Sequence, residues 1–289
     1  MEQNINLSEL IFNSINELLN SLFSSIDFSI YSILDNLTFV DTSILSNSYF
    51  QQILGRNSSE GILLICNSLV FGIIIYYSIS FLISHFTYYS VDSPKQFVFK
   101  CIIFIAITNS SLWICEQIIN IVSIITLLIS SISKSLFGLE ASFSNFIDNI
   151  NMSVYMSGEL NVFSFNGIVK SFTSFGLINL VFSYSLRYIM IQIFVLISPF
   201  AFLSLVSNSS EWFFKVWLKN FLSLLLVQVF VSIILLLSFS IPLTDTSSIT
   251  QLLYIGIIYA LSRANSYIKE IFGGISTSVN SNISTFLNR

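Results

Sequence analysis

The chain has 289 residues, of which 54% are hydrophobic and only 9% are charged, and its formal net charge is −4. A soluble domain usually carries about 25% charged residues, so this composition argues strongly against a water-soluble enzyme. The aromatic content of 15% excludes a disordered chain, and the acidic balance argues against a nucleic-acid-binding surface. The composition therefore predicts an all-α, polytopic membrane protein.

The first 60 residues form an acidic, amphipathic region. Apolar residues recur at three- and four-residue steps from Leu7 to Ile26, which is the period of a helix with one apolar face. The region has seven acidic residues, and its first basic residue is Arg56, so it lacks the basic start of a cleavable signal peptide. We predict one or two extracytoplasmic helices, packed on each other, on the membrane body or on a partner.

Apolar tracts after residue 60 predict a membrane domain over residues 61–272 with about five transmembrane helices. A span needs about 20 mainly apolar residues. The tract 99–132 contains polar residues but no strong turn signal, so we predict one long tilted helix there. The tract 168–206 is likewise predicted to be one helix with a bend at Pro199, while 249–268 is weak and could instead be re-entrant or interfacial. The predicted spans lie near 61–85, 99–132, 168–206, 220–241 and 249–268.

Basic residues in alternate loops predict the orientation. Lys95 and Lys100 precede the second span, and Lys215 and Lys219 precede the fourth. Because cytoplasmic loops are enriched in Lys and Arg, these loops should face the cytoplasm. The N-terminus and a helical loop over 133–167 then lie outside, and the C-terminal tail, residues 273–289, lies inside.

Polar and charged residues interrupt the apolar tracts. A charge in the middle of a bilayer costs about 2.5–3.5 kcal/mol, so it should face other helices or water. Two interpretations stay open: the residues line a lumen or proton path, or they hold helices together. A Glu116–Arg187 pair, within or between subunits, is a further alternative. The candidates are Asn109, Glu116 and Asn120 on one helical face, with Arg187 and Gln228 in later spans.

The segment before the fourth span combines aromatic and basic residues. Both kinds of residue are enriched where a membrane meets water. The pattern predicts a segment lying flat on the inner leaflet, with interfacial anchors at Trp212, Lys215, Trp217 and Lys219.

No enzyme motif is recognisable in the sequence. It contains no phosphate-binding glycine loop, no H-E-x-x-H and no G-x-S-x-G. The three cysteines lie in apolar stretches without the spacing of metal ligands, and the chain has a single histidine. We therefore expect no enzymatic activity, no metal and no cofactor, and any energy for transport should come from a partner ATPase or an ion gradient.

The order of four features resembles the TrbL-type polytopic channel subunits of type IV secretion and conjugation systems. Arg187 is followed by Pro199 in LISPFAF, by Trp217 in FKVWLKNF and by Gln228 inside the next span. The resemblance covers roughly residues 60–272. It implies a subunit of the bacterial cytoplasmic (inner) membrane that helps form the translocation path for DNA or protein. It also implies partners, namely other secretion-system membrane subunits, their ATPases and further copies of the chain in a homo-oligomer.

Two other functions remain as alternatives. The first is the membrane subunit of a small-solute permease or transporter, although we find no internal repeat and few proline residues in the spans. The second is a holin-type pore protein, for which the long acidic N-terminal region would be unusual.

Overall fold

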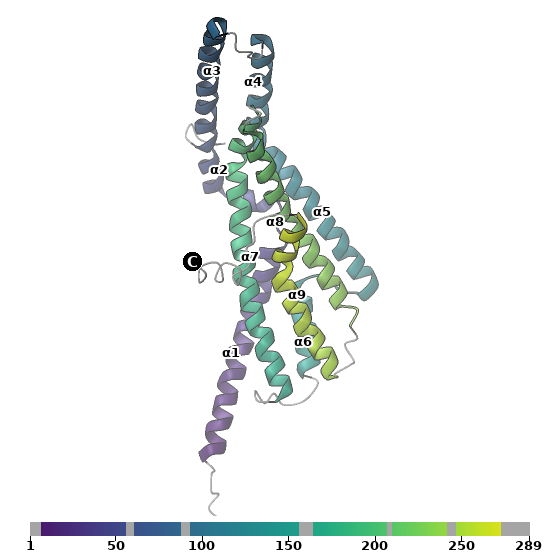
Figure 1. Ribbon diagram of the computed structural model, residues 1–289. Coiled ribbons are helices and arrows are strands. Elements are labelled where there is room, and N and C mark those ends of the chain that lie inside the picture. The colour runs from purple at the N-terminus through teal and green to yellow at the C-terminus, as the bar shows by residue number, and fades with distance from the viewer. Residues whose placement is uncertain are drawn as a thin grey trace, which may run out of the picture.

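The computed structural model describes residues 7–55, 61–87, 93–155, 164–206, 210–241 and 247–272, which form an elongated helical bundle (Figure 1). No strand occurs in these ranges, so the predicted all-α class is confirmed. Four of the described helices are long and apolar enough to cross a membrane. They are α3 (Ile62–Thr87), α5 (Ser111–Phe137), α7 (Phe165–Leu203) and α8 (Glu211–Ser238). The chain is therefore a multi-pass membrane protein.

The N-terminal region is one long helix, α1 (Leu7–Thr38), followed by the short 3₁₀ helix η1 (Thr42–Leu45) and by α2 (Ser48–Leu54). The first turns of α1 extend beyond the other helices, whereas its last turns pack on α7 (Figure 1). Residues from Leu34 to Leu54 contribute buried side chains to the bundle. The N-terminal region was predicted to pack on itself, on the membrane body or on a partner. Residues 34–54 pack on the membrane body. Their extracytoplasmic location stays a prediction.

The predicted helical loop over 133–167 contains α6 (Phe143–Tyr155), which packs against α1, α8 and α9. The carboxylate of Asp35 on α1 caps the first turn of α6. It accepts hydrogen bonds from the backbone N–H groups of Phe143 at 2.6 Å and Ser144 at 3.2 Å. These N–H groups have no partner inside their own helix, so the cap joins the N-terminal helix to this loop.

The predicted single helix over 99–132 is wrong, because the structure divides this tract at Ser110. The first part, α4 (Pro94–Asn109), begins earlier than predicted, and α5 starts at Ser111 in a new direction (Figure 1). Ser110 leaves the helical conformation with φ −91° and ψ 3°. The Asn109 side chain exchanges amide hydrogen bonds with Asn67 of α3, at 3.2 and 3.4 Å. This contact joins the end of α4 to α3, and the chain leaves the helical conformation at the next residue.

The single helix predicted for 168–206 is confirmed as α7, in which Pro199 is an interior residue. Proline has no N–H, so the carbonyl of Val195 loses its usual helical donor. The hydroxyl of Ser198 donates to this carbonyl at 2.7 Å. The helix therefore continues past the proline with the freed carbonyl satisfied.

The weak tract at 249–268 is a full helix, α9 (Ser248–Phe272), packed on α7 and α8. It is not among the four helices that qualify as candidate spans. A close approach to α7 is possible because residue 176 is glycine: a Cβ atom there would lie 2.4 Å from a methyl group of Ile258. The Tyr184 hydroxyl also donates to the carbonyl of Leu261 at 3.1 Å.

The bundle has two hydrophobic cores along its length. The first contains α1, α6, α7, α8 and α9, with Tyr184 and Val231 among its buried residues. The second contains η1, α2, α5, α7 and α8, with Ile191 and Leu225 among its buried residues. Arg187 lies between Tyr184 and Ile191 on α7, and Gln228 lies between Leu225 and Val231 on α8. These two polar residues are therefore where the two cores meet.

Candidate functional site: an arginine–glutamine clasp

Arg187 lies at the meeting point of the two cores, with its side chain fully buried. Its guanidinium group makes three hydrogen bonds inside the chain. Nε donates to the carbonyl of Leu224 at 2.8 Å, and the two terminal nitrogens donate to the carbonyl of Thr38 at 3.0 Å and to Gln228 Oε1 at 3.1 Å. The planar fork of arginine suits it to reach several acceptors in different directions.

The bond to Thr38 satisfies the end of α1. The last four carbonyl groups of a helix have no partner within it, and a cation near them is favourable because the helix dipole is negative there. Thr38 is the final residue of α1, and the last turn of that helix has no basic residue of its own. Arg187 on α7 therefore supplies the positive charge that α1 lacks.

Gln228 on α8 binds both backbone groups of Val40, which lies two residues beyond the end of α1. Its Oε1 accepts from the N–H of Val40 at 3.1 Å, and its Nε2 donates to the carbonyl of Val40 at 3.3 Å. We call the group of Thr38, Val40, Arg187, Leu224 and Gln228 the Arg187–Gln228 clasp. It joins the end of α1 to α7 and α8 with every charge-assisted bond made inside one subunit.

This geometry favours one of the interpretations of Arg187. Its side chain has no exposed surface in the single chain and bonds groups of α1 and α8, which supports the interpretation as a helix-joining residue. The guanidinium nitrogens of Arg187 donate to Leu224, Thr38 and Gln228, so the predicted pair with Glu116 does not account for its charge.

No family model, curated protein or solved structure matches this chain.

Trp217 of the family-like pattern lies in the second core and Pro199 is buried on α7, each about three turns along its helix from the clasp. Trp217 is 2% exposed, and its Nε1 donates to the carbonyl of Phe194 on α7 at 2.9 Å. Its ring stacks on Phe221 with a centroid distance of 5.3 Å. Pro199 is buried on α7 a little more than one turn beyond Phe194.

The predicted flat segment before the fourth span is therefore wrong in part. Residues from Glu211 onward are the first turns of α8 itself, and Trp217 is a core residue because its face of α8 packs on α7. Trp212, Lys215 and Lys219 are exposed, so their role as interfacial anchors stays a prediction. Lys215 pairs with Glu211 at 3.0 Å, but an exposed pair of this kind contributes little stability.

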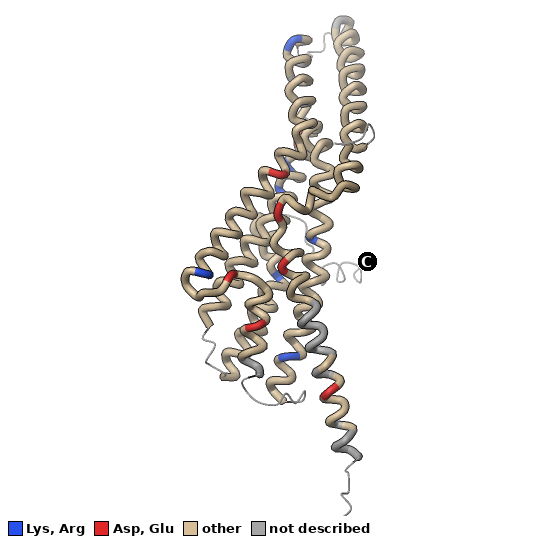
Figure 2. Tube along the Cα trace, turned by 180° about the vertical axis from the view of Figure 1, so that it is seen from behind, with Lys and Arg blue, Asp and Glu red and all other residues tan. Residues whose placement is uncertain are grey.

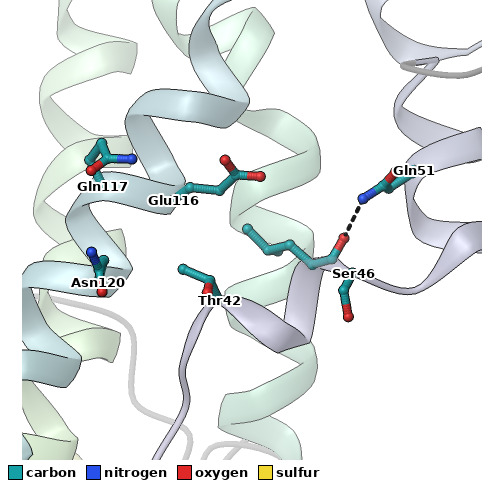
Figure 3. Close-up of a pocket in the computed structure, with 7 residues that line it drawn as sticks. Thr42, Ser46, Gln51, Glu116, Gln117 and Asn120 are labelled. Atoms are coloured by element: carbon teal, nitrogen blue, oxygen red, sulfur yellow. Dashed lines mark hydrogen bonds between the residues drawn. The ribbon is translucent and has the colours of Figure 1, made fainter.

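The predicted polar face of 109–120 is divided by the break at Ser110. Asn109 faces α3, as described above, whereas Glu116 and Asn120 on α5 line a polar cavity of about 380 Å³ (Figure 3). Figure 3 shows the Glu116 side chain directed from α5 toward η1 and α2, which contribute Thr42, Ser46 and Gln51. The described residues contain no group of three or more His, Cys, Asp or Glu side chains that could hold a metal ion.

The sequence indicated Arg187 and Gln228 as candidate residues but did not identify their hydrogen-bond partners. Their partners include backbone groups of Thr38, Val40 and Leu224. Every residue type has a backbone carbonyl group, so the sequence does not show which carbonyl accepts a bond. It also missed Lys170, which is 3% exposed and donates to Asn151 Oδ1 on α6. A basic residue early in an apolar tract was a signal for such a contact, because a buried lysine needs a partner.

Proposed function

We propose that this chain is a structural channel and scaffold subunit of a type IV secretion (conjugative transfer) machine in the bacterial cytoplasmic membrane. The contacts made by the positions that carry the resemblance support this proposal. Arg187 bonds Gln228, and Trp217 bonds the carbonyl of Phe194 near Pro199. The family-like pattern thus includes two separate contacts between α7 and α8.

The observation that carries the proposal is the closed interior at the clasp. Secondary transporters usually bind solute near the bilayer midplane, between helices that are unwound there. Here α7 and α8 are continuous helices on both sides of Arg187 and Gln228, and these side chains fill the space between them. This arrangement favours a scaffold over a small-solute permease. A translocation path would then form between copies of the chain or between the chain and its partners.

The proposal includes the predicted orientation and partners. The N-terminus lies outside and the C-terminus lies in the cytoplasm, following the basic residues of alternate loops. The subunit assembles with further copies, with other membrane subunits and with the ATPases that supply energy, and it has no enzymatic activity or cofactor of its own. DNA or protein contacts it only as a passing substrate.

Deleting the gene is expected to abolish mating or secretion while growth, DNA processing and uptake of small solutes stay unchanged. The physical reason is that a scaffold is needed for assembly but catalyses nothing itself. Transfer frequency in a mating assay measures the effect, and the intact gene supplied in trans should restore it. The purified chain should show no ATPase activity and should co-purify from membranes with the machine's ATPase.

The matched comparison is solute transport in the same strains. If deletion leaves transfer intact and removes uptake or efflux of one small solute, the permease alternative replaces the proposal.

A further inference from the structure

The polar cavity beside Glu116 lies on a helical path that is longer than the hydrocarbon core of a bilayer is thick. Helices α4 and α5 contain 16 and 27 residues, which gives a path of about 64 Å at about 1.5 Å per residue. The hydrocarbon core of a bilayer is only about 30 Å thick, so one edge of that core falls along this path. The α4–α5 break and the polar residues after it divide the path into two apolar zones.

The surrounding charges support this placement. Figure 2 shows that charged residues are sparse, and α3 carries no acidic or basic residue. Trp113, three residues before Glu116, is 62% exposed, as is common for aromatic residues at a membrane interface.

The cavity is a formed site rather than a gap between loose segments. Gln51 Nε2 donates to the carbonyl of Leu45 at 3.3 Å, which holds α2 against η1 (Figure 3). Asp41 accepts from the N–H of Ser43 at 2.8 Å and so caps η1, and Asn47 accepts from the N–H of Tyr49 at 2.9 Å and caps α2. These bonds fix the wall that faces α5.

The lining has one carboxylate, three amides and two hydroxyls. They belong to Glu116, to Gln51, Gln117 and Asn120, and to Thr42 and Ser46. The carboxylate and the amide oxygens are acceptors for a primary ammonium group, and the amide N–H groups and hydroxyls are donors for a phosphate. A zwitterionic headgroup carries both of these groups.

The same lining discriminates among common headgroups. A quaternary ammonium such as choline offers no N–H donor and is usually bound by aromatic rings, none of which lines this cavity. An anionic headgroup needs basic residues, and the lining has Glu116 but no Lys or Arg. We infer that this cavity binds the headgroup of phosphatidylethanolamine, with its primary ammonium on Glu116 and its phosphate near the amides of α5.

Lipid retention by the full-length chain tests this inference. The protein is reconstituted in nanodiscs of equal parts dioleoylphosphatidylethanolamine and dioleoylphosphatidylcholine, released into mild detergent and analysed by native mass spectrometry. We expect phosphatidylethanolamine to be retained about tenfold over phosphatidylcholine, consistent with the loss of charge-assisted hydrogen bonds when the ammonium is methylated. Glu116→Gln should remove this preference, and Glu211→Gln, which alters an acid outside the cavity, should keep it. Soluble phosphoethanolamine should not displace the lipid.

Equal retention of the two lipids, or an unchanged preference in Glu116→Gln, would overturn the inference, and so would displacement by soluble phosphoethanolamine. If Glu116→Gln does not fold, the wild-type chain provides the test. Its Tm is measured with phosphatidylethanolamine and with its mono-, di- and trimethylated forms. We expect the Tm to fall step by step as each methyl group removes a donor, and equal Tm values across the series would contradict the proposed site.

Discussion

Replacing Arg187 by methionine should release residues 38–54 from the bundle while the helices of the membrane domain still form. Methionine matches only the aliphatic part of arginine and donates no hydrogen bond, so the carbonyl of Thr38 loses its partner and Gln228 Oε1 loses one of the groups that donate to it. Buried acceptors without partners cost about 1–3 kcal/mol each, so we expect the free energy of unfolding to fall by about 2–4 kcal/mol. Denaturant unfolding in detergent measures this change, and limited proteolysis should show new cleavage between residues 41 and 54.

Arg263→Met is the matched control. Arg263 is exposed on α9 and lies over the ring of Tyr259 at 5.5 Å, so its replacement should change the free energy of unfolding by less than about 0.5 kcal/mol. A double-mutant cycle with Gln228→Leu should show coupling, because the two side chains share a hydrogen bond. Wild-type stability and wild-type protease resistance in Arg187→Met would show that the clasp does not hold the N-terminal region.

Replacing Trp217 by alanine is expected to lower the free energy of unfolding by about 3–5 kcal/mol, the usual cost of deleting a large buried aromatic side chain. The ring is 2% exposed and contacts Phe202 and Phe221, so its removal leaves a cavity between α7 and α8. Trp217→Phe keeps most of the packing but loses the bond to Phe194, so it should cost about 1 kcal/mol from that bond. Denaturant unfolding followed by tryptophan fluorescence is the measurement.

Trp212→Ala is the comparison that distinguishes a core role from an interfacial one. Trp212 is 63% exposed on the same helix, so its loss should change stability by no more than about 0.5 kcal/mol. If both tryptophans were interfacial anchors, the two alanine variants would behave alike. Equal small effects would therefore contradict the core position of Trp217.

The sequence alone determined that the chain is helical and inserted in a membrane. Long apolar tracts leave few alternatives in a bilayer, where every backbone group must be satisfied within its own segment. The tract at 168–206 is one helix as predicted, because no residue near Arg187 favours a turn and the hydroxyl of Ser198 compensates for Pro199. The sequence also singled out Arg187 and Glu116, since a charge in an apolar tract is costly; Arg187 is fully buried and hydrogen-bonded, and a role for Glu116 stays a prediction.

Only the tertiary structure decided what these residues contact. The partners of Arg187 on α1 and α8 lie 149 and 41 positions away in the chain, and two of its three acceptors are backbone carbonyls that any residue type could supply. Trp217 follows a pattern of Trp and Lys that is typical of a membrane surface, yet packing against α7 buries it. The break at Ser110 likewise follows no strong local turn signal, and it comes directly after the asparagine contact between α3 and α4. Periodicity and composition indicate whether a segment is, on average, in an apolar or a polar environment. Which residues one side chain contacts depends on which surfaces the folded chain brings together.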